Sequence, residues 1–224
     1  MMKFAVIVAG GSGQRMGTDI PKQFLLLNGK PVLYYTLTTF LESYPDLNII
    51  LVLPEAHTAK GEEIIQSIKG KNRIKLVAGG ETRFHSVKNG LQHISQPSIV
   101  FVHDGVRCMI SKELIRKCFD HAVVHKSAIP AVASTDSIRI AEGDHNQMID
   151  RNKVRIVQTP QTFTSEILVE AFQQPYQASF TDEASVVEAN GTTVHLIEGD
   201  YNNLKITHPI DLLIAENLMK QTIS

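Results

Sequence analysis

Short apolar segments recur along this chain and alternate with segments whose apolar residues follow a helical spacing. We expect the apolar segments to form strands at residues 4–9, 48–53, 73–77, 98–102 and 127–133. A strand that is apolar on both faces must be covered on both faces, which is typical of a parallel sheet between two layers of helices. The alternation therefore predicts an α/β fold with an open, doubly wound, mostly parallel sheet.

The intervening segments have the periodicity of amphipathic helices. We expect helices at residues 31–40, 56–69, 83–94, 111–125, 165–173 and 182–189, and a further strand at 193–197. Ser111 is a suitable N-cap for the fourth helix. Pro209 falls in the first turn of a C-terminal helix. The apolar stripe of that helix, which we expect to be buried, comprises Ile210, Leu213, Ile214 and Leu218.

Length and composition are those of one globular domain. The 224 residues are 43% hydrophobic and 20% charged, without an evident repeat or linker, so residues 1–224 are predicted to form a single domain. The pattern changes at residues 134–158, where two extended runs flank a polar turn at residues 142–144. We interpret this segment as a β-hairpin arm. Because a lone hairpin has little core of its own, we expect it to pack on a second subunit in a homodimer.

Charge and cysteine content narrow the classes of partner. The formal net charge of −1 does not point to nucleic acid. Cys108 and Cys118 lack the CxxC spacing of metal sites, and a chain without a disulfide framework fits a reducing cytoplasm. No apolar stretch approaches the roughly 18 residues that span a bilayer, so no membrane association is expected.

A glycine-rich loop directly after the first strand gives the first indication of function. It occupies residues 10–17, contains Arg15, and is followed shortly by Lys22. Open α/β sheets bind ligands at the carboxyl ends of their strands, and backbone amides of a glycine loop can approach an anion closely. With two added cations, this loop is predicted to bind phosphate.

Two familiar phosphate-binding motifs do not fit the loop. The P-loop has Lys-Ser/Thr after its last glycine, whereas Thr18 and Asp19 follow Gly17. The dinucleotide fingerprint needs glycine or alanine where Met16 stands, and an acidic residue about 20 residues later that is missing here. An NAD-dependent oxidoreductase is therefore disfavoured.

The loop resembles the signature of sugar-phosphate nucleotidyltransferases. The chain is most similar to the cytidylyltransferases that act on 2-C-methyl-D-erythritol 4-phosphate in the non-mevalonate isoprenoid pathway. The matching motifs are AGGSGQRMG and PKQF within residues 9–24, GGETR and Ser86 within 79–86, VHDGVR at 102–107, DRN at 150–152, QTPQ at 158–161, TDEAS at 181–185 and NLKIT at 203–207. The resemblance implies a Rossmann-like, GT-A-like fold, with CTP and a small sugar-alcohol phosphate as substrates and Mg²⁺ as cofactor.

The implied reaction explains why a nucleophile–base pair is not needed. A phosphate monoester has a second pKa of about 6, so the acceptor is already ionised when it attacks the α-phosphorus of CTP. Catalysis then consists of positioning and cationic stabilisation. Arg15 and Lys22 match residues that stabilise the transition state, and Arg151 and Lys205 match residues that hold the acceptor phosphate. Because Arg151 lies on the predicted arm, it could serve the site of a partner subunit.

The resemblance also assigns binding residues. Those implied for the nucleotide, besides Arg15 and Lys22, are Ala9, Gly10, Gly11, Ser12, Gly13, Gly80, Glu81, Arg83 and Ser86. Those implied for the acceptor, besides Arg151 and Lys205, are Asp104, Arg107, Ser137, Thr159 and Thr181. Thr159 could instead shape the turn before Pro160. The chain departs from the family pattern at Cys108, where proline is common, and at Ser137, where threonine is common.

Asp104 has more than one chemical interpretation. A carboxylate at the end of an apolar strand could hold Mg²⁺, bind an acceptor hydroxyl, or cap the next turn. Its neighbour His103 is interpreted as a hydrogen-bonded structural histidine. His121 and His125 have a usable metal-ligand spacing but no evident third ligand.

Two alternative functions stay open at this point. Ribitol 5-phosphate is the competing acceptor, because the two groups of cytidylyltransferases share most motifs. A non-catalytic nucleotide-sensing protein is the alternative from another class, although Lys22 and Lys205 are both present.

Overall fold

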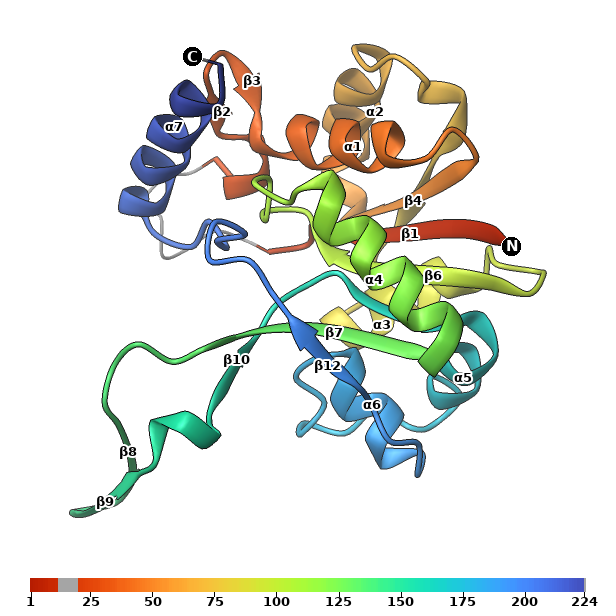
Figure 1. The fold of residues 1–224 in the computed structure, drawn as a ribbon. Coiled ribbons are helices and arrows are strands. Elements are labelled where there is room, and N and C mark those ends of the chain that lie inside the picture. Colours follow the sequence, from red (N-terminus) through yellow and green to blue (C-terminus); the bar gives the residue numbers. More distant parts are fainter. Residues whose placement is uncertain (12–19, 224) are drawn as a thin grey trace.

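The computed structural model describes residues 1–11 and 20–223, and it contains one large sheet between two layers of helices (Figure 1). Four parallel strands lie side by side in the order β6 (Ser98–Asp104), β1 (Met2–Val8), β4 (Leu47–Leu53) and β5 (Ile74–Ala78). Each lies within two residues of the strand expected from its apolar run. The α/β, mostly parallel architecture is confirmed.

The sheet continues beyond β6 with a strand that the sequence analysis missed. β11 (Gln161–Thr164) lies between β6 and β7 (Ser127–Ala133) and is antiparallel to both. β7 also pairs with β10 (Arg155–Val157) in antiparallel and with β12 (Leu196–Glu198) in parallel orientation. β11 therefore interrupts the parallel order in the middle of the sheet.

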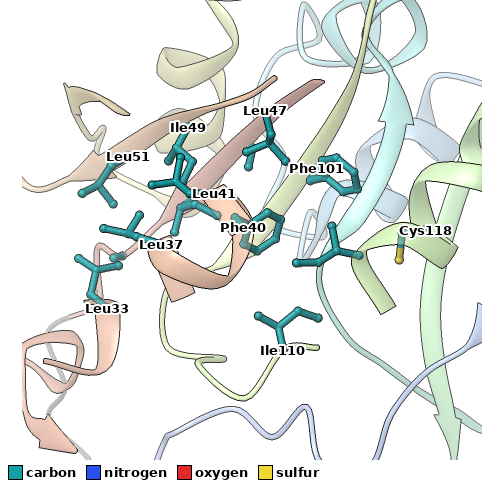
Figure 2. Packing of buried hydrophobic residues seen from close by; sticks show 14 of the residues in the cluster. Leu33, Leu37, Phe40, Leu41, Leu47, Ile49, Leu51, Phe101, Ile110 and Cys118 are labelled. Carbon is teal, nitrogen blue, oxygen red and sulfur yellow. The ribbon is translucent and has the colours of Figure 1, made fainter. Parts of the chain in front are cut away.

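Helices cover both faces, as a doubly wound sheet requires. One face packs on α1 (Val32–Ser43), α2 (Thr58–Gln66) and α4 (Lys112–His125), and the other on α3 (Arg83–Leu91), α5 (Ser165–Ala171) and α6 (Glu183–Ala189). Alternate residues of β1 divide between the two layers, with Ala5 and Ile7 on the first face and Val6 and Val8 on the second. Figure 2 shows α1 presenting Leu33, Leu37, Phe40 and Leu41 to the first face.

Local polar groups determine where several helices begin. The side chain of Ser111 accepts a hydrogen bond from the amide of Leu114 at the start of α4, as expected for an N-cap. Thr82 caps α3 in the same way, and Asp182 forms a capping box with Ser185 at α6. Short 3₁₀ helices occupy Lys22–Phe24, Glu55–His57, Lys71–Arg73 and Arg151–Lys153.

Residues 134–158 form a hairpin and a returning strand. β8 (Ile138–Glu142) pairs with β9 (His145–Ile149) in a separate two-stranded sheet, which projects from the body in Figure 1. The second extended run was expected to continue to residue 158. A 3₁₀ turn at Arg151–Lys153 interrupts it instead, and β10 then joins the central sheet against β7. The free hairpin is therefore shorter than predicted.

The buried face of the C-terminal helix was predicted wrongly. In α7 (Pro209–Ile223) the side chains of Ile210, Leu213 and Ile214 are 58%, 55% and 45% exposed. The face that packs carries Leu212, Ala215 and Met219, against a small cluster that includes Leu27 of β2 (Leu26–Leu27), next to β3 (Lys30–Pro31). Both stripes have helical spacing, and the neighbouring surface selects between them. Within the described ranges, no helix is long and apolar enough to cross a membrane.

Candidate functional site

Three glycine-containing turns, which follow β6, β1 and β5, are hydrogen-bonded to the carboxyl ends of the neighbouring strands β1 and β4. The Gly105 amide donates to the Val8 carbonyl at 2.8 Å, the Ala9 amide to Val52 at 3.0 Å, and the Gly79 amide to Leu53 at 2.7 Å. A pocket of about 340 Å³ opens at this edge of the sheet. Its described lining comprises Val8, Ala9, Gly10, Gly11, Lys22, Gln23, Pro54, Gly79, Gly80, Glu81, Thr82, Arg83, Ser86, Asp104, Val106 and Lys205.

The N-terminus of α3 forms one wall of this pocket. Ser86 Oγ accepts a hydrogen bond from the Gly80 amide at 3.1 Å, and Thr82 caps the helix. A Cβ atom on Gly80 would overlap the side chain of His85, so the tight turn requires glycine here. The wall therefore presents backbone, small side chains and the positive end of a helix, which suit a polar, partly anionic ligand.

Lys22 and Gln23 form the wall next to the glycine loop. The Lys22 side chain passes close to Gly11, where an added Cβ would lie 3.5 Å from Lys22 Cε. Gln23 is buried, and its Nε2 donates to the Ala9 carbonyl at 2.8 Å. The predicted residues Ser12, Gly13 and Arg15 lie outside the described residues.

Asp104 stands at the centre of a cluster of cations. Its Oδ2 lies 2.8 Å from Lys205 Nζ and 3.7 Å from Arg107 Nε, and its Oδ1 lies 3.3 Å from Arg83 Nη2. Burial opposes ionisation of this carboxyl. The positive charges of Arg83 and Lys205 outweigh burial and hold the pKa of Asp104 well below its ordinary value. Asp104 is therefore a carboxylate that fixes cations at the pocket.

Glu183 is a part of this cluster to which the sequence analysis gave no role. Its carboxylate pairs with both terminal nitrogens of Arg83, and the Glu183 side chain is 1% exposed. Burial lowers the pKa of Arg83, but Glu183 and Asp104 together raise it well above its ordinary value. Glu183 lies within the TDEAS motif, which was the available signal. Its contact with Arg83 depends on residues 100 positions apart meeting in the fold.

His103 and Thr159 form a chain of hydrogen bonds that runs from the backbone amide of Asp104 to the backbone carbonyl of Arg107. The Asp104 amide donates to Thr159 Oγ1 at 3.0 Å, and this oxygen lies 3.1 Å from His103 Nδ1. His103 Nε2 donates to the Arg107 carbonyl at 3.2 Å. Burial lowers the pKa of His103 to about 3, so the ring is neutral and Nδ1 accepts from the threonine hydroxyl. This arrangement favours structural roles for His103 and Thr159.

Of the predicted acceptor residues, Asp104 and Lys205 line the pocket, and Arg107 and Thr159 contact Asp104 without lining it. The other three are not part of the lining and are exposed. Arg151 is exposed beyond the hairpin, and its Nη1 donates to the Thr135 carbonyl at 2.9 Å. Ser137 is exposed just before β8. Thr181 is exposed before α6, and its amide donates to Ser185 Oγ at 3.2 Å. The fold thus brings Lys22, Arg83, Asp104 and Lys205 together and leaves these three apart.

The described side chains do not fit a direct protein site for Mg²⁺. Asp104, for which Mg²⁺ binding was one of the interpretations, already contacts three cationic side chains, which would repel a divalent ion. Among the described residues, no group of three histidine, cysteine or acidic side chains could hold a metal. This holds although His195 brings a third ring near His121 and His125, with a centroid 5.2 Å from that of His125.

The departure at Cys108 is accommodated by packing. Cys108 is buried in a cluster with Val106 and Ile206, and burial raises the pKa of its thiol to about 12. A thiol so hard to ionise is a poor nucleophile. Cys108 therefore replaces proline as a small apolar side chain.

A glycine loop, a neighbouring lysine and a strand-end carboxylate with its cations, all at the carboxyl edge of a doubly wound sheet, define a nucleotide-binding α/β enzyme. The sequence model of the family described as IspD, 2-C-methyl-D-erythritol 4-phosphate cytidylyltransferase, matches residues 3–221. The chain belongs to this family of nucleotidyltransferases.

Individual relatives agree with the family match. The chain is 44% identical over 219 residues to the 2-C-methyl-D-erythritol 4-phosphate cytidylyltransferase of Phocaeicola vulgatus, covering 98% of this chain and 100% of the relative. It is 47% identical to that of Porphyromonas gingivalis, with 97% of each covered. The crystal structure of the 4-diphosphocytidyl-2C-methyl-D-erythritol synthase of Anaerococcus prevotii superposes with a TM-score of 0.83 at 28% identity, covering 98% of both chains.

Proposed function

We propose that this chain transfers CMP from CTP to 2-C-methyl-D-erythritol 4-phosphate, producing 4-diphosphocytidyl-2-C-methyl-D-erythritol and pyrophosphate for isoprenoid precursor biosynthesis. One observation carries the proposal: a single pocket contains the start of the glycine loop, Lys22 and the Lys205–Asp104 pair. The family match over residues 3–221 supports the identity of both substrates.

In the proposed reaction, an oxygen of the acceptor phosphate forms a bond to the α-phosphorus of CTP. The bond between that phosphorus and the bridging oxygen breaks, and its electron pair leaves with pyrophosphate. The acceptor phosphate is largely dianionic at neutral pH, so no side chain has to remove a proton. Cations that approach the developing charge supply the stabilisation.

We assign these cations as the sequence analysis suggested. Lys22, with Arg15, would stabilise the α-phosphate and the leaving pyrophosphate. Lys205 would exchange part of its contact with Asp104 for the acceptor phosphate, and Arg151 would approach the same phosphate from the partner's arm. Backbone groups and small side chains at Gly80 and Ser86 would receive the nucleoside.

Mg²⁺ remains part of the proposal as an ion that accompanies the triphosphate. Mg²⁺ commonly keeps several waters and binds substrate phosphates rather than an all-protein cage. This mode agrees with the cationic surroundings of Asp104. We also propose a cytoplasmic homodimer joined through the arm. Exposed apolar side chains at Ile140, Met148 and Ile156 support the interface.

The test is acceptor-dependent release of pyrophosphate from CTP. We expect release with 2-C-methyl-D-erythritol 4-phosphate and at least tenfold lower kcat/KM with ribitol 5-phosphate. Lys22→Ala and Arg15→Ala should each lower kcat/KM by about a hundredfold or more while changing the melting temperature little. No release with either alcohol phosphate would favour a nucleotide sensor. Normal turnover by both variants would mean that this loop takes no part in catalysis.

A further inference from the structure

Gln158 joins the end of β10 to the segment that carries Lys205. The Gln158 side chain is buried, its Nε2 donates to the Asp200 carbonyl at 2.8 Å, and its Oε1 accepts from the Asp200 amide at 3.2 Å. One side chain therefore satisfies both backbone groups of Asp200. Its own amide donates to the Pro130 carbonyl of β7 at 2.8 Å, which fixes Gln158 to the central sheet.

Asn203 makes a second attachment closer to Lys205. Asn203 is fully buried, and its Nδ2 donates to the Thr159 carbonyl at 2.8 Å. Its backbone carbonyl accepts from Arg107 Nη1 at 2.8 Å. Lys205 thus lies between two attached residues, because the Ile206 amide also donates to the Val106 carbonyl at 3.1 Å.

These attachments replace regular secondary structure. Residues 199–207 form neither helix nor strand, so no ladder of backbone hydrogen bonds holds the segment in place. Buried amide side chains are costly unless they are hydrogen-bonded, and here they bond chiefly to backbone groups around this segment. The half-exposed Lys205 side chain then places its ammonium 2.8 Å from Asp104.

We propose that Gln158 and Asn203 are positioning residues for Lys205, holding its backbone at the distance from which its ammonium can bind the phosphate of the acceptor. The inference rests on the proposed function, because it takes Lys205 as an acceptor ligand. It also gives the first residue of the QTPQ motif a role. Gln158 lies directly after β10, so it links the strand at the base of the arm to the segment that carries Lys205. A displacement of about 1 Å at such a position can cost about a hundredfold in rate.

Gln161 supplies a matched control on the other side of Pro160. It is also a buried glutamine, and its side chain makes two hydrogen bonds, from Nε2 to Asp182 Oδ2 at 2.8 Å and from the Ala184 amide to Oε1 at 2.7 Å. Its partners belong to the start of α6 instead of the segment with Lys205. Gln158→Met and Gln161→Met are therefore the same substitution at two buried glutamines whose side chains hydrogen-bond to different segments.

The experiment measures KM for each substrate in purified full-length variants, at a temperature well below their melting transitions. We expect Gln158→Met to raise the KM for 2-C-methyl-D-erythritol 4-phosphate about tenfold and that for CTP less than twofold. Gln161→Met should leave the KM for the acceptor within twofold. If Gln158→Met does not fold, Asn203→Leu tests the same attachment with the same expectation.

A double variant distinguishes positioning from general damage. In a Lys205→Ala background, Gln158→Met should no longer raise the KM of the acceptor, because the side chain through which it acts is gone. Equal effects in both backgrounds, or an unchanged acceptor KM in both Gln158→Met and Asn203→Leu, would overturn the inference. Failure of the proposed function looks different, because the wild-type chain itself would then show no acceptor-dependent release.

Discussion

Arg83 lies between two carboxylates, and this arrangement determines how firmly the nucleotide wall of the pocket is held. Asp104 reaches Arg83 from the end of β6, and Glu183 reaches it from the first turn of α6. The guanidinium group therefore connects α3 to elements on either side. Removing one partner of a buried ion pair leaves an uncompensated charge, which is more costly than removing a pair exposed to solvent.

The first prediction concerns Glu183. We expect Glu183→Ala to lower the free energy of unfolding by about 3 kcal/mol, because Arg83 then loses the carboxylate that pairs with both its terminal nitrogens and keeps only Asp104. Glu188→Ala, at an exposed position of the same helix, should cost less than about 0.5 kcal/mol. Urea denaturation of both variants measures the difference, and equal losses would show that the ion pair contributes no more than helix propensity.

The second prediction concerns pH and His103. Its pKa of about 3 in the folded chain lies below the ordinary value of 6.5 because the ring is buried. The unfolded chain therefore takes up the proton first, and stability is lost as the pH falls below about 6.5. Between pH 7.5 and 5.5 this one group should cost about 1.4 kcal/mol.

His103→Gln tests this assignment, because glutamine keeps a donor and an acceptor but does not titrate. The variant should lose about 1.4 kcal/mol less than the wild type over the same pH range, whatever its stability at neutral pH. Parallel urea titrations at the two pH values provide the comparison. Identical pH dependence in the two proteins would mean that the folded ring takes up its proton over the same pH range as the unfolded one.

At the scale of elements, α4 begins directly after the N-cap that the sequence predicted for it. Ser111 was expected as its N-cap, and its side chain accepts the Leu114 amide at 3.1 Å. We expect Ser111→Ala to lower the free energy of unfolding by about 1 kcal/mol, and Ser111→Gly to lower it by only a few tenths. Thermal denaturation measures both variants. If alanine cost no more than glycine, the hydrogen bond would not be contributing.

β11 was missed because its burial depends on distant partners. Three of its four residues are polar, and two of these, Gln161 and Thr162, are almost completely buried together with Phe163. Gln161 is satisfied by Asp182 and Ala184, which follow it by about 20 residues. The exposed stripe of α7 is the opposite case, because its apolar spacing suggested burial but the neighbouring surface accommodates a different face.

At the scale of the whole molecule, Arg151 lies outside the pocket of its own chain. It belongs to a 3₁₀ turn beyond the free hairpin, which extends away from the body in Figure 1. If arms exchange in the proposed homodimer, Arg151 of one chain completes the acceptor side of the other. A twofold dimer contains two equivalent sites, so variants that each lack one residue of a shared site can complement each other in a mixed dimer.

Mixing two inactive variants tests this exchange. Arg151→Ala and Lys22→Ala homodimers should each have low activity. After unfolding and refolding together in equal amounts, half of the dimers are mixed and one of their two sites has both residues intact. Activity should then return to about a quarter of the wild-type value. Sedimentation should give twice the mass of the chain, and no recovery from a dimeric mixture would place both residues in one subunit.

The sequence by itself determined the layers, the strand edge that carries the pocket, and its nucleotide-binding motifs. Apolar runs and glycine loops are local signals, since they reflect what each segment can bury and how it can turn. Only the tertiary structure decided that Glu183 holds Arg83, that Gln158 and Asn203 hold the segment of Lys205, and which face of α7 packs. Those outcomes depend on hydrogen bonds and contacts between residues far apart in sequence, which form only after the chain has folded.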